Sequence, residues 1–92
     1  MLLQRQAKQG SNKMGQVEGL IKVLAESLVE HPDEVEVNEI EGENALIVEL
    51  KVASSDVGKV IGKQGKIARA IRTLAKAKGN KIGRKVVVEI IT

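Results

Sequence analysis

The sequence predicts an α+β fold in which three helices pack against a three-stranded sheet, in the chain order α-β-β-α-α-β. Two patterns predict it. In three segments, apolar residues fall three or four positions apart, as on one face of a helix. In three others, they alternate with polar residues, as in half-buried strands. At 92 residues the chain has room for one modest core, so we expect a single domain over residues 15–92.

The first helix is expected from Gln16, where an apolar stripe begins. Pro32 ends it, because a residue before proline is pushed out of the helical region. Residues 1–14 have no such period and carry three bases, so we expect a flexible basic tail. An added segment, or an upstream start with Met14 as the native initiator, would give the same pattern. The stripe consists of Val17, Leu20, Ile21, Leu24 and Leu28.

Residues 34–40 and 45–53 are predicted to be the two strands of a β-hairpin. Valines alternate with polar residues in the first strand, and four aliphatic residues from Leu46 to Val52 do so in the second. Ile40 is out of phase and marks either a bulge or the end of the strand. Gly42 lies within the four-residue turn, so a tight connection is expected.

Two helices and a last strand are predicted after the hairpin. Ser54, Ser55 and Asp56 offer N-caps for a short helix that ends near Ile61. A second helix is expected from Lys66 to about Lys78, ended by a left-handed cap at Gly79-Asn80. Its buried stripe is Ile67, Ala70, Ile71 and Leu74, and its basic side is Lys66, Arg69, Arg72 (or Thr73) and Lys76. Residues 84–91 form the last strand.

The segment between these two helices, Val60-Ile61-Gly62-Lys63-Gln64-Gly65, is the most informative in the chain. Its glycines allow a sharp turn and close approach to another molecule, and the next helix presents its positive dipole end to a phosphate. The spacing does not fit a Walker A loop, in which Gln64 would have to be Ser or Thr, nor a dinucleotide fingerprint, which needs glycine at Val60. A helix–turn–helix whose glycines serve geometry alone remains the alternative.

Charge is strongly segregated along the chain. Residues 16–50 have a net charge of −9, residues 51–92 have +9, and the first fifteen residues add +3. The basic half is centred on the two-glycine loop, which predicts a surface for a polyanion. If the two halves interleave in space, the surface is instead mixed.

Composition argues against several functions. The chain has no cysteine, no aromatic residue and one histidine, His31. It therefore lacks a thiol nucleophile, a Cys-ligated zinc and the aromatic platforms on which many RNA-binding domains stack bases. The acidic run from Asp33 to Glu43 is interpreted as a solvated strand face. We expect no catalytic residue, metal, cofactor or membrane segment, and a cytoplasmic location.

From about Gly15 to Ile91 the chain resembles a type II KH domain, and within that group the small bacterial single-KH-domain RNA-binding proteins of the KhpA type. A GxxG loop between two helices is the hallmark of the KH module. The stretches that carry the resemblance are His31-Pro32-Asp33 with Val35-Glu36-Val37, Gly58-Lys59-Val60-Ile61-Gly62-Lys63-Gln64-Gly65, and Ile67-Ala68 with Ala70-Ile71-Arg72-Thr73.

The resemblance implies that single-stranded RNA lies across a narrow groove, bound by a non-catalytic RNA chaperone or post-transcriptional regulator. The loop Gly62–Gly65 would hold sugar and phosphate, and an edge strand would contact the bases through backbone groups. Aliphatic residues near the loop would form the floor, although core packing explains most of them; Ile61 is expected to be partly exposed. The expected RNA-binding residues are Lys59, Ile61, Gly62, Lys63, Gln64, Gly65, Lys66 and Arg69.

An assembly module is the alternative function. Ile47, Val87 and Ile91 lie on strand faces opposite the main apolar sets, so some of them are expected to be exposed. The resemblance implies a homodimer, a second and larger KH-containing RNA-binding protein as partner, or both. RNA binding and assembly are compatible with each other.

Overall fold

The computed structural model describes the backbone of residues 2–92 and the side chains of residues 15–92. Within that part, helices and strands follow the predicted order, which confirms the α+β class. Short 3-10 turns lie at Pro32–Glu34, Ser54–Asp56 and Lys63–Gly65. The elements are α1 (Leu2–Leu28), β1 (Glu36–Glu41), β2 (Leu46–Lys51), α2 (Val57–Ile61), α3 (Lys66–Lys81) and β3 (Val86–Ile90).

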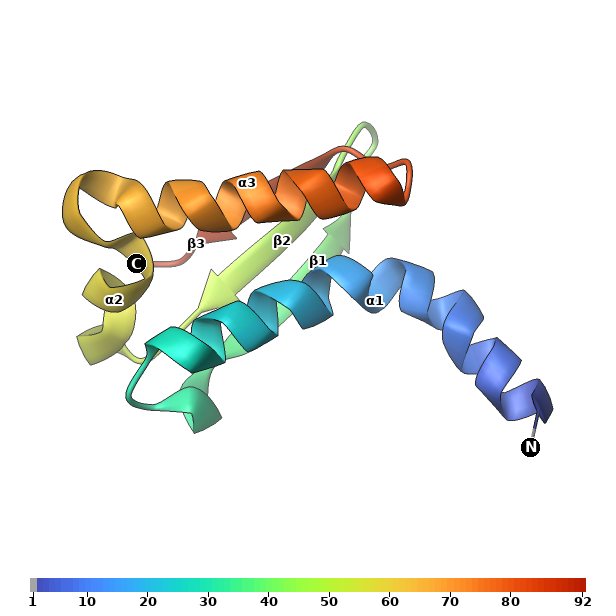
Figure 1. Ribbon diagram of the computed structural model, residues 1–92, viewed down its shortest axis with the longest axis horizontal. Coiled ribbons are helices and arrows are strands. Elements are labelled where there is room, and N and C mark those ends of the chain that lie inside the picture. The colour runs from blue at the N-terminus through green and yellow to red at the C-terminus, as the bar shows by residue number, and fades with distance from the viewer. Residues whose placement is uncertain (1) are drawn as a thin grey trace.

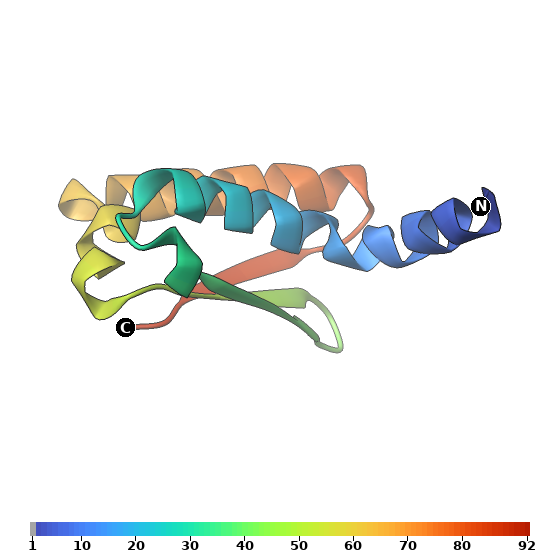
Figure 2. The ribbon, with the colours of Figure 1, turned by 90° about the horizontal axis from the view of Figure 1, so that it is seen from below.

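The molecule has two layers, with α1 and α3 side by side on one face of the sheet (Figures 1 and 2). The strand order is β1-β2-β3, antiparallel between β1 and β2 and parallel between β2 and β3. Among residues 2–92, no helix covers the other face of the sheet (Figure 2). The hydrophobic core between the layers is built from Val, Ile, Leu and Ala side chains, and its fully buried larger members include Val17, Ile21, Leu46, Val48, Leu50 and Val60.

Ile40 does not mark a bulge. The register of β1 against β2 is continuous from Glu36, opposite Lys51, to Glu41, opposite Leu46. Ile40 is exposed on the open face because the inward position beside it is taken by Glu39. The Glu39 carboxylate lies under α1 and accepts a hydrogen bond of 3.0 Å from the Glu18 amide. Burial raises the pKa of Glu39, despite that hydrogen bond.

α1 begins at Leu2, well before the expected start near Gln16. Residues 2–13 contain many good helix formers, such as Leu, Gln, Arg, Ala and Lys, which explains why the helix continues there. This part projects beyond the sheet (Figure 1), and the side chains of residues 1–14 lie outside the described part. The flexibility of this segment stays a prediction. Over residues 2–92, no helix combines the length and apolar character needed to cross a membrane.

The prediction that the helix from Lys66 ends at Gly79-Asn80 is wrong. α3 continues through Gly79 to Lys81, and the left-handed residue is Gly83, with φ 74°. Gly79 is instead a contact point between α3 and the start of β3. A Cβ there would lie 2.6 Å from the Arg84 carbonyl oxygen and 2.6 Å from Val86 Cγ2. The glycine therefore serves close packing rather than helix termination.

Candidate nucleic-acid interface

The segment between α2 and α3 is a tight turn built from left-handed residues. Gly62 has φ 75° and ψ 173°, Gln64 has φ 56° and ψ 24°, and Gly65 has φ 75° and ψ 16°. Gln64 is the only non-glycine residue with positive φ among residues 2–92, and such strain in a non-glycine residue is concentrated at functional sites. A right-handed residue, Lys63, followed by a left-handed one forms a nest of amides that suits an anion.

Gly62 fixes the shape of this turn by close packing. A Cβ at Gly62 would lie 2.6 Å from Ile67 Cγ1 and 3.0 Å from the Ile67 backbone nitrogen. The Gly62 amide donates to the Gly58 carbonyl, and the Gly62 carbonyl accepts from the Gly65 amide. The chain therefore leaves α2 and enters α3 in one compact turn that only glycine permits at this position.

The polar side chains of the turn point to solvent. Lys63, Gln64 and Lys66 are all exposed. Arg69, one turn into α3, donates from Nη1 to the Gln64 carbonyl oxygen at 2.9 Å. This hydrogen bond ties the strained residue to α3 and leaves other guanidinium donors of Arg69 for a ligand. The structure thus brings four of the predicted binding side chains to one place.

Two other predicted binding residues have structural partners. Ile61 is half-buried and packs against the core, while its neighbour Val60 is fully buried. Lys59 lies beside Asp56, with Lys59 Nζ 3.5 Å from Asp56 Oδ1. Its charge is therefore partly neutralised at the start of α2, which reduces the field it can exert on a phosphate.

Asp56 joins the end of α1 to the start of α2. Its side chain is fully buried and makes no hydrogen bond that caps α2, so the predicted N-cap role of Asp56 is wrong. It accepts hydrogen bonds from the amides of Glu30 and His31, at 3.2 and 3.0 Å. Burial alone would raise the pKa of Asp56, but these amides, with His31 and Lys59, hold it below its ordinary value of 3.8.

We expect Asp56→Asn to lower the melting temperature at neutral pH by on the order of 10 °C, because one of two buried amides loses its acceptor. Since the folded-state pKa of Asp56 is lowered, its contribution to stability is fully present above pH 3.8 and is lost as pH falls through the folded-state pKa. In thermal melts from neutral to strongly acidic pH, the melting temperatures of the variant and the wild type should converge. Asp33→Asn, at an exposed site nearby, is the control. A difference in melting temperature that stays constant with pH would contradict a role for the negative charge of Asp56.

The loop opens onto a line of contact between α3 and the edge strand β3. Arg72 lies on this line, and its Nε donates to the Val88 carbonyl oxygen at 3.4 Å. Because β3 has a partner on one side only, the backbone groups on its outer edge face α3 and solvent. Sequence reasoning placed Arg72 on the basic side of α3 but did not include it in the site. The parallel return of β3, which brings Val88 to Arg72, has no local signature in the sequence.

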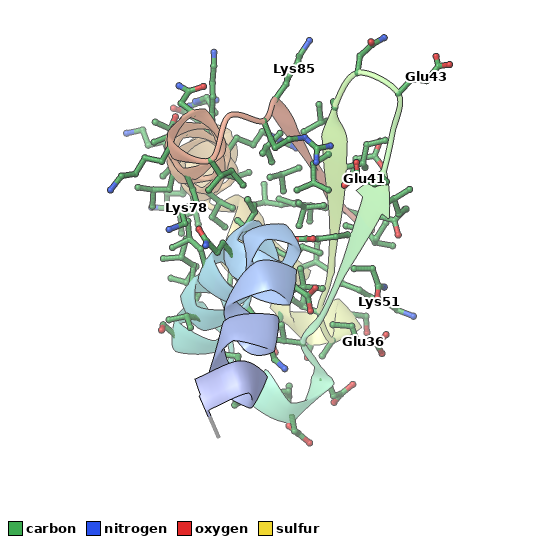
Figure 3. All side chains as sticks on the ribbon, turned by 90° about the vertical axis from the view of Figure 1, so that its right-hand side faces the viewer. Glu36, Glu41, Glu43, Lys51, Lys78 and Lys85 are labelled. Carbon is green, nitrogen blue, oxygen red and sulfur yellow. The ribbon has the colours of Figure 1, made fainter. Side chains whose placement is uncertain are left out.

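Bases dominate around the loop and α3 and acids dominate on β1 and the hairpin, and the two sets meet at the Glu41–Arg84 ion pair and at Lys51, which lies opposite Glu36. Around α3, Lys66, Arg69, Arg72, Lys76 and Lys81 are exposed and Lys78 is half-buried, whereas four acids lie between Glu36 and Glu43 on β1 and the hairpin turn. Figure 3 shows Lys85 on the α3 side and Glu43 at the hairpin tip. Glu41 and Arg84 form a bidentate ion pair, with distances of 2.6 and 3.0 Å. The face formed by the loop, α3 and β3 is therefore cationic.

The sequence matches the family model described as KhpA/KhpB, KH domain, over residues 18–90. A relative from Caldanaerobacter subterraneus, named RNA-binding protein KhpA, is 61% identical over 72 residues, which cover 78% of this chain and 96% of the relative. A protein of the same name from Aquifex aeolicus is 49% identical over 78 residues, covering 85% and 99%. The loop described above lies inside each of these matches.

Two solved structures resemble the fold. One is a variant of Era from Aquifex aeolicus bound to GDP.AlF4-, with a TM-score of 0.60, 24% identity and 84% of this chain covered. The other is Era in complex with MgGDPNP and nucleotides 1506–1542 of 16S ribosomal RNA, with a TM-score of 0.56, 26% identity and 76% covered. This chain spans 30% and 27% of those chains. The likeness therefore concerns one part of a larger protein.

Proposed function

The chain belongs to the KhpA/KhpB family of KH domains, and from this premise we propose that it binds single-stranded RNA without catalysing a reaction. The observation that carries the proposal is the strained turn Gly62–Gly65, which exposes Lys63 and Gln64 on a cationic face. Its role in the bacterial cytoplasm is that of an RNA chaperone or post-transcriptional regulator. Crosslinking the protein to RNA in cells and sequencing the bound RNA tests this directly, and an absence of enriched RNA would contradict it.

In this proposal the turn grips the sugar–phosphate backbone. The amides at Lys63 and Gln64 and the start of α3 face a phosphate, because a nest and a helix N-terminus both favour an anion. Lys63, Gln64, Lys66 and Arg69 reach neighbouring phosphates and sugars, and Lys59 contributes a weaker field. The aliphatic surface at Ile61 lies under the bases. Because the chain has no aromatic residue, base stacking adds little to the affinity. Selectivity for RNA sequence therefore comes from contacts between the bases and the backbone of β3.

Binding of short unstructured RNA should depend strongly on salt. A KH loop clamps a backbone of about four nucleotides, so about three or four phosphates are engaged. The logarithm of the association constant should then fall with the logarithm of salt at a slope of about −2 to −3. Fluorescence anisotropy over a salt series measures it. Tighter binding to a perfect duplex than to an unstructured strand of equal length would contradict a narrow groove.

We also propose that the protein self-associates or pairs with a larger KH-containing protein, since one groove for about four nucleotides binds weakly on its own. A groove of about 300 Å³ between α1 and α3 supports this. The groove is lined by Leu24, Leu28, Ile67, Ala70, Ile71 and Leu74, together with Ser27 and Lys66, and Leu74 is 46% exposed. On the open sheet face, Ile40, Ile47 and Val87 form one row across the strands, but Glu49 and Glu89 lie beside it. The helical groove is the more continuous apolar surface.

We expect Leu74→Glu to shift the protein to monomer in sedimentation velocity, because a charge would be buried in the apolar contact. Val87→Glu, at a similarly exposed position on the open face, should leave the oligomer unchanged. RNA long enough to span two grooves should bind the wild type much more tightly than a tetranucleotide does. This choice of surface would be overturned if the wild type is strictly monomeric. It would also be overturned if Val87→Glu gives a monomer and Leu74→Glu leaves the oligomer intact.

A further inference from the structure

A second cationic hollow lies at the far end of α3 from the Gly62–Gly65 loop. It has a volume of about 430 Å³ and is lined by Lys76, Asn80, Gly83, Arg84, Lys85 and Val86. Lys76 and Asn80 lie near the end of α3, the next three residues come from the turn that follows, and Val86 is the first residue of β3. Figure 3 shows Lys85, just before β3, projecting outward from the molecule between α3 and the hairpin.

The three cations of this hollow are not equivalent. Arg84 is held by Glu41 through two hydrogen bonds, which raise the pKa of Arg84 and lower that of Glu41. Arg84 is therefore a structural link between the turn and the hairpin. Among the side chains of residues 15–92, no acid forms an ion pair with Lys76 or Lys85. These two ammonium groups and the Asn80 side-chain amide, which lines the same hollow, remain available to an anion.

The hollow is connected to the loop by a basic stripe on α3. Arg69, Arg72, Lys76 and Asn80 recur at intervals of three or four residues, so they lie along one side of the helix. Arg72 already contacts the edge of β3 about halfway along, through the Val88 carbonyl. The rise of a helix places Lys76 roughly 16 Å beyond Gly65, so the basic stripe extends well past the loop.

We propose that this hollow is a second phosphate-binding subsite, which takes the backbone of the RNA segment that continues past the loop along α3 and β3. This inference rests on the proposed RNA binding. The chemistry fits a polyanion better than a single small ion, because the cations form a continuous line from loop to hollow rather than one enclosed cluster. It extends the contact surface of one chain beyond the nucleotides gripped at Gly62–Gly65.

The test compares a tetranucleotide with a dodecanucleotide of unstructured RNA, for the wild type and for Lys76→Gln with Lys85→Gln. Both lysines are exposed, so the fold should persist, which thermal melts would verify. We expect tetranucleotide affinity to stay within about twofold of the wild type, and dodecanucleotide affinity to fall about five- to tenfold. The salt slope for the longer RNA should become shallower by about 1.4, since two phosphate contacts are lost. Lys22→Gln with Lys51→Gln removes the same amount of charge from α1 and the open sheet face. This control variant should bind both RNAs with the affinity of the wild type.

Unchanged dodecanucleotide affinity and salt slope in the Lys76/Lys85 variant would overturn the subsite, as would an equal loss for both RNA lengths. A wild type that binds neither RNA would instead overturn the proposed function. If the higher affinity for the longer RNA comes from two loops in a dimer, the Lys76/Lys85 variant will keep it. That result also counts against the subsite.

Discussion

Replacing Lys63 and Gln64 together by aspartate is expected to weaken RNA binding by at least about 100-fold, or about 2.7 kcal/mol. Both side chains are exposed, so little packing is lost. Two carboxylates would then face the phosphates in place of one cation and one neutral amide. Aspartate also tolerates the left-handed conformation that Gln64 adopts, so the turn should keep its shape. Anisotropy titrations at matched salt measure the loss, and thermal melts should show an intact fold.

Lys51→Asp with Asn38→Asp is a matched control, because it makes the same change in net charge on the open sheet face. This control should bind RNA within a few-fold of the wild type. If the loop variant binds as well as the control does, the RNA-binding surface lies elsewhere on the molecule.

Gly62→Ala should damage both stability and binding, with a loss of at least about 3 kcal/mol in the free energy of unfolding. With φ 75° and ψ 173°, Gly62 occupies a region that is essentially restricted to glycine. The added Cβ would also meet Ile67 Cγ1 at 2.6 Å and the Ile67 backbone at 3.0 Å, and the backbone cannot rotate away. Against a typical total of about 5–15 kcal/mol, this is a large fraction. Urea denaturation of both proteins measures it.

Two other glycines serve as controls for Gly62. At Gly58 a Cβ would meet nothing within 4 Å, and the position is helical, so Gly58→Ala should leave stability equal or raise it by up to about 1 kcal/mol. At Gly65 the conformation is left-handed, but the nearest atom is the flexible tip of Arg69 at 3.4 Å, so Gly65→Ala should cost only about 1–2 kcal/mol. A Gly62→Ala protein as stable as Gly58→Ala would contradict the close packing of this turn.

The order of elements could be predicted because each rests on a local pattern: the stripe from Val17 to Leu28, the alternation around Val48 and the glycines at 62 and 65. The errors arose where tertiary contacts outweigh local preference. Gly79 has the composition of a helix end, yet it lies inside α3 because Arg84 and Val86 pass too close for a side chain. Asp56 has the position of an N-cap, yet its carboxylate binds the amides that follow α1.

The candidate site was predictable at the loop and incomplete elsewhere. Lys63, Gln64 and Lys66 are adjacent in sequence, so their proximity requires no knowledge of the fold. The contact of Arg72 with Val88, and the grouping of Lys76 with Lys85, depend on β3 returning parallel to β2 beside α3. These contacts are decided by packing between distant segments, whereas the pairing of Lys59 with Asp56 joins residues only three positions apart.

The parallel direction of β3 has a practical consequence for experiments on this protein. Because β3 runs back along α3, the chain ends at Thr92 near α2, at the end of the molecule where the candidate RNA loop lies, whereas α1 starts at the opposite end (Figure 1). A purification tag or fluorescent reporter fused after Thr92 would emerge beside the candidate RNA loop and would obstruct access to it. Fusions and surface immobilisation are therefore better made through the N-terminus, with the loop facing solution.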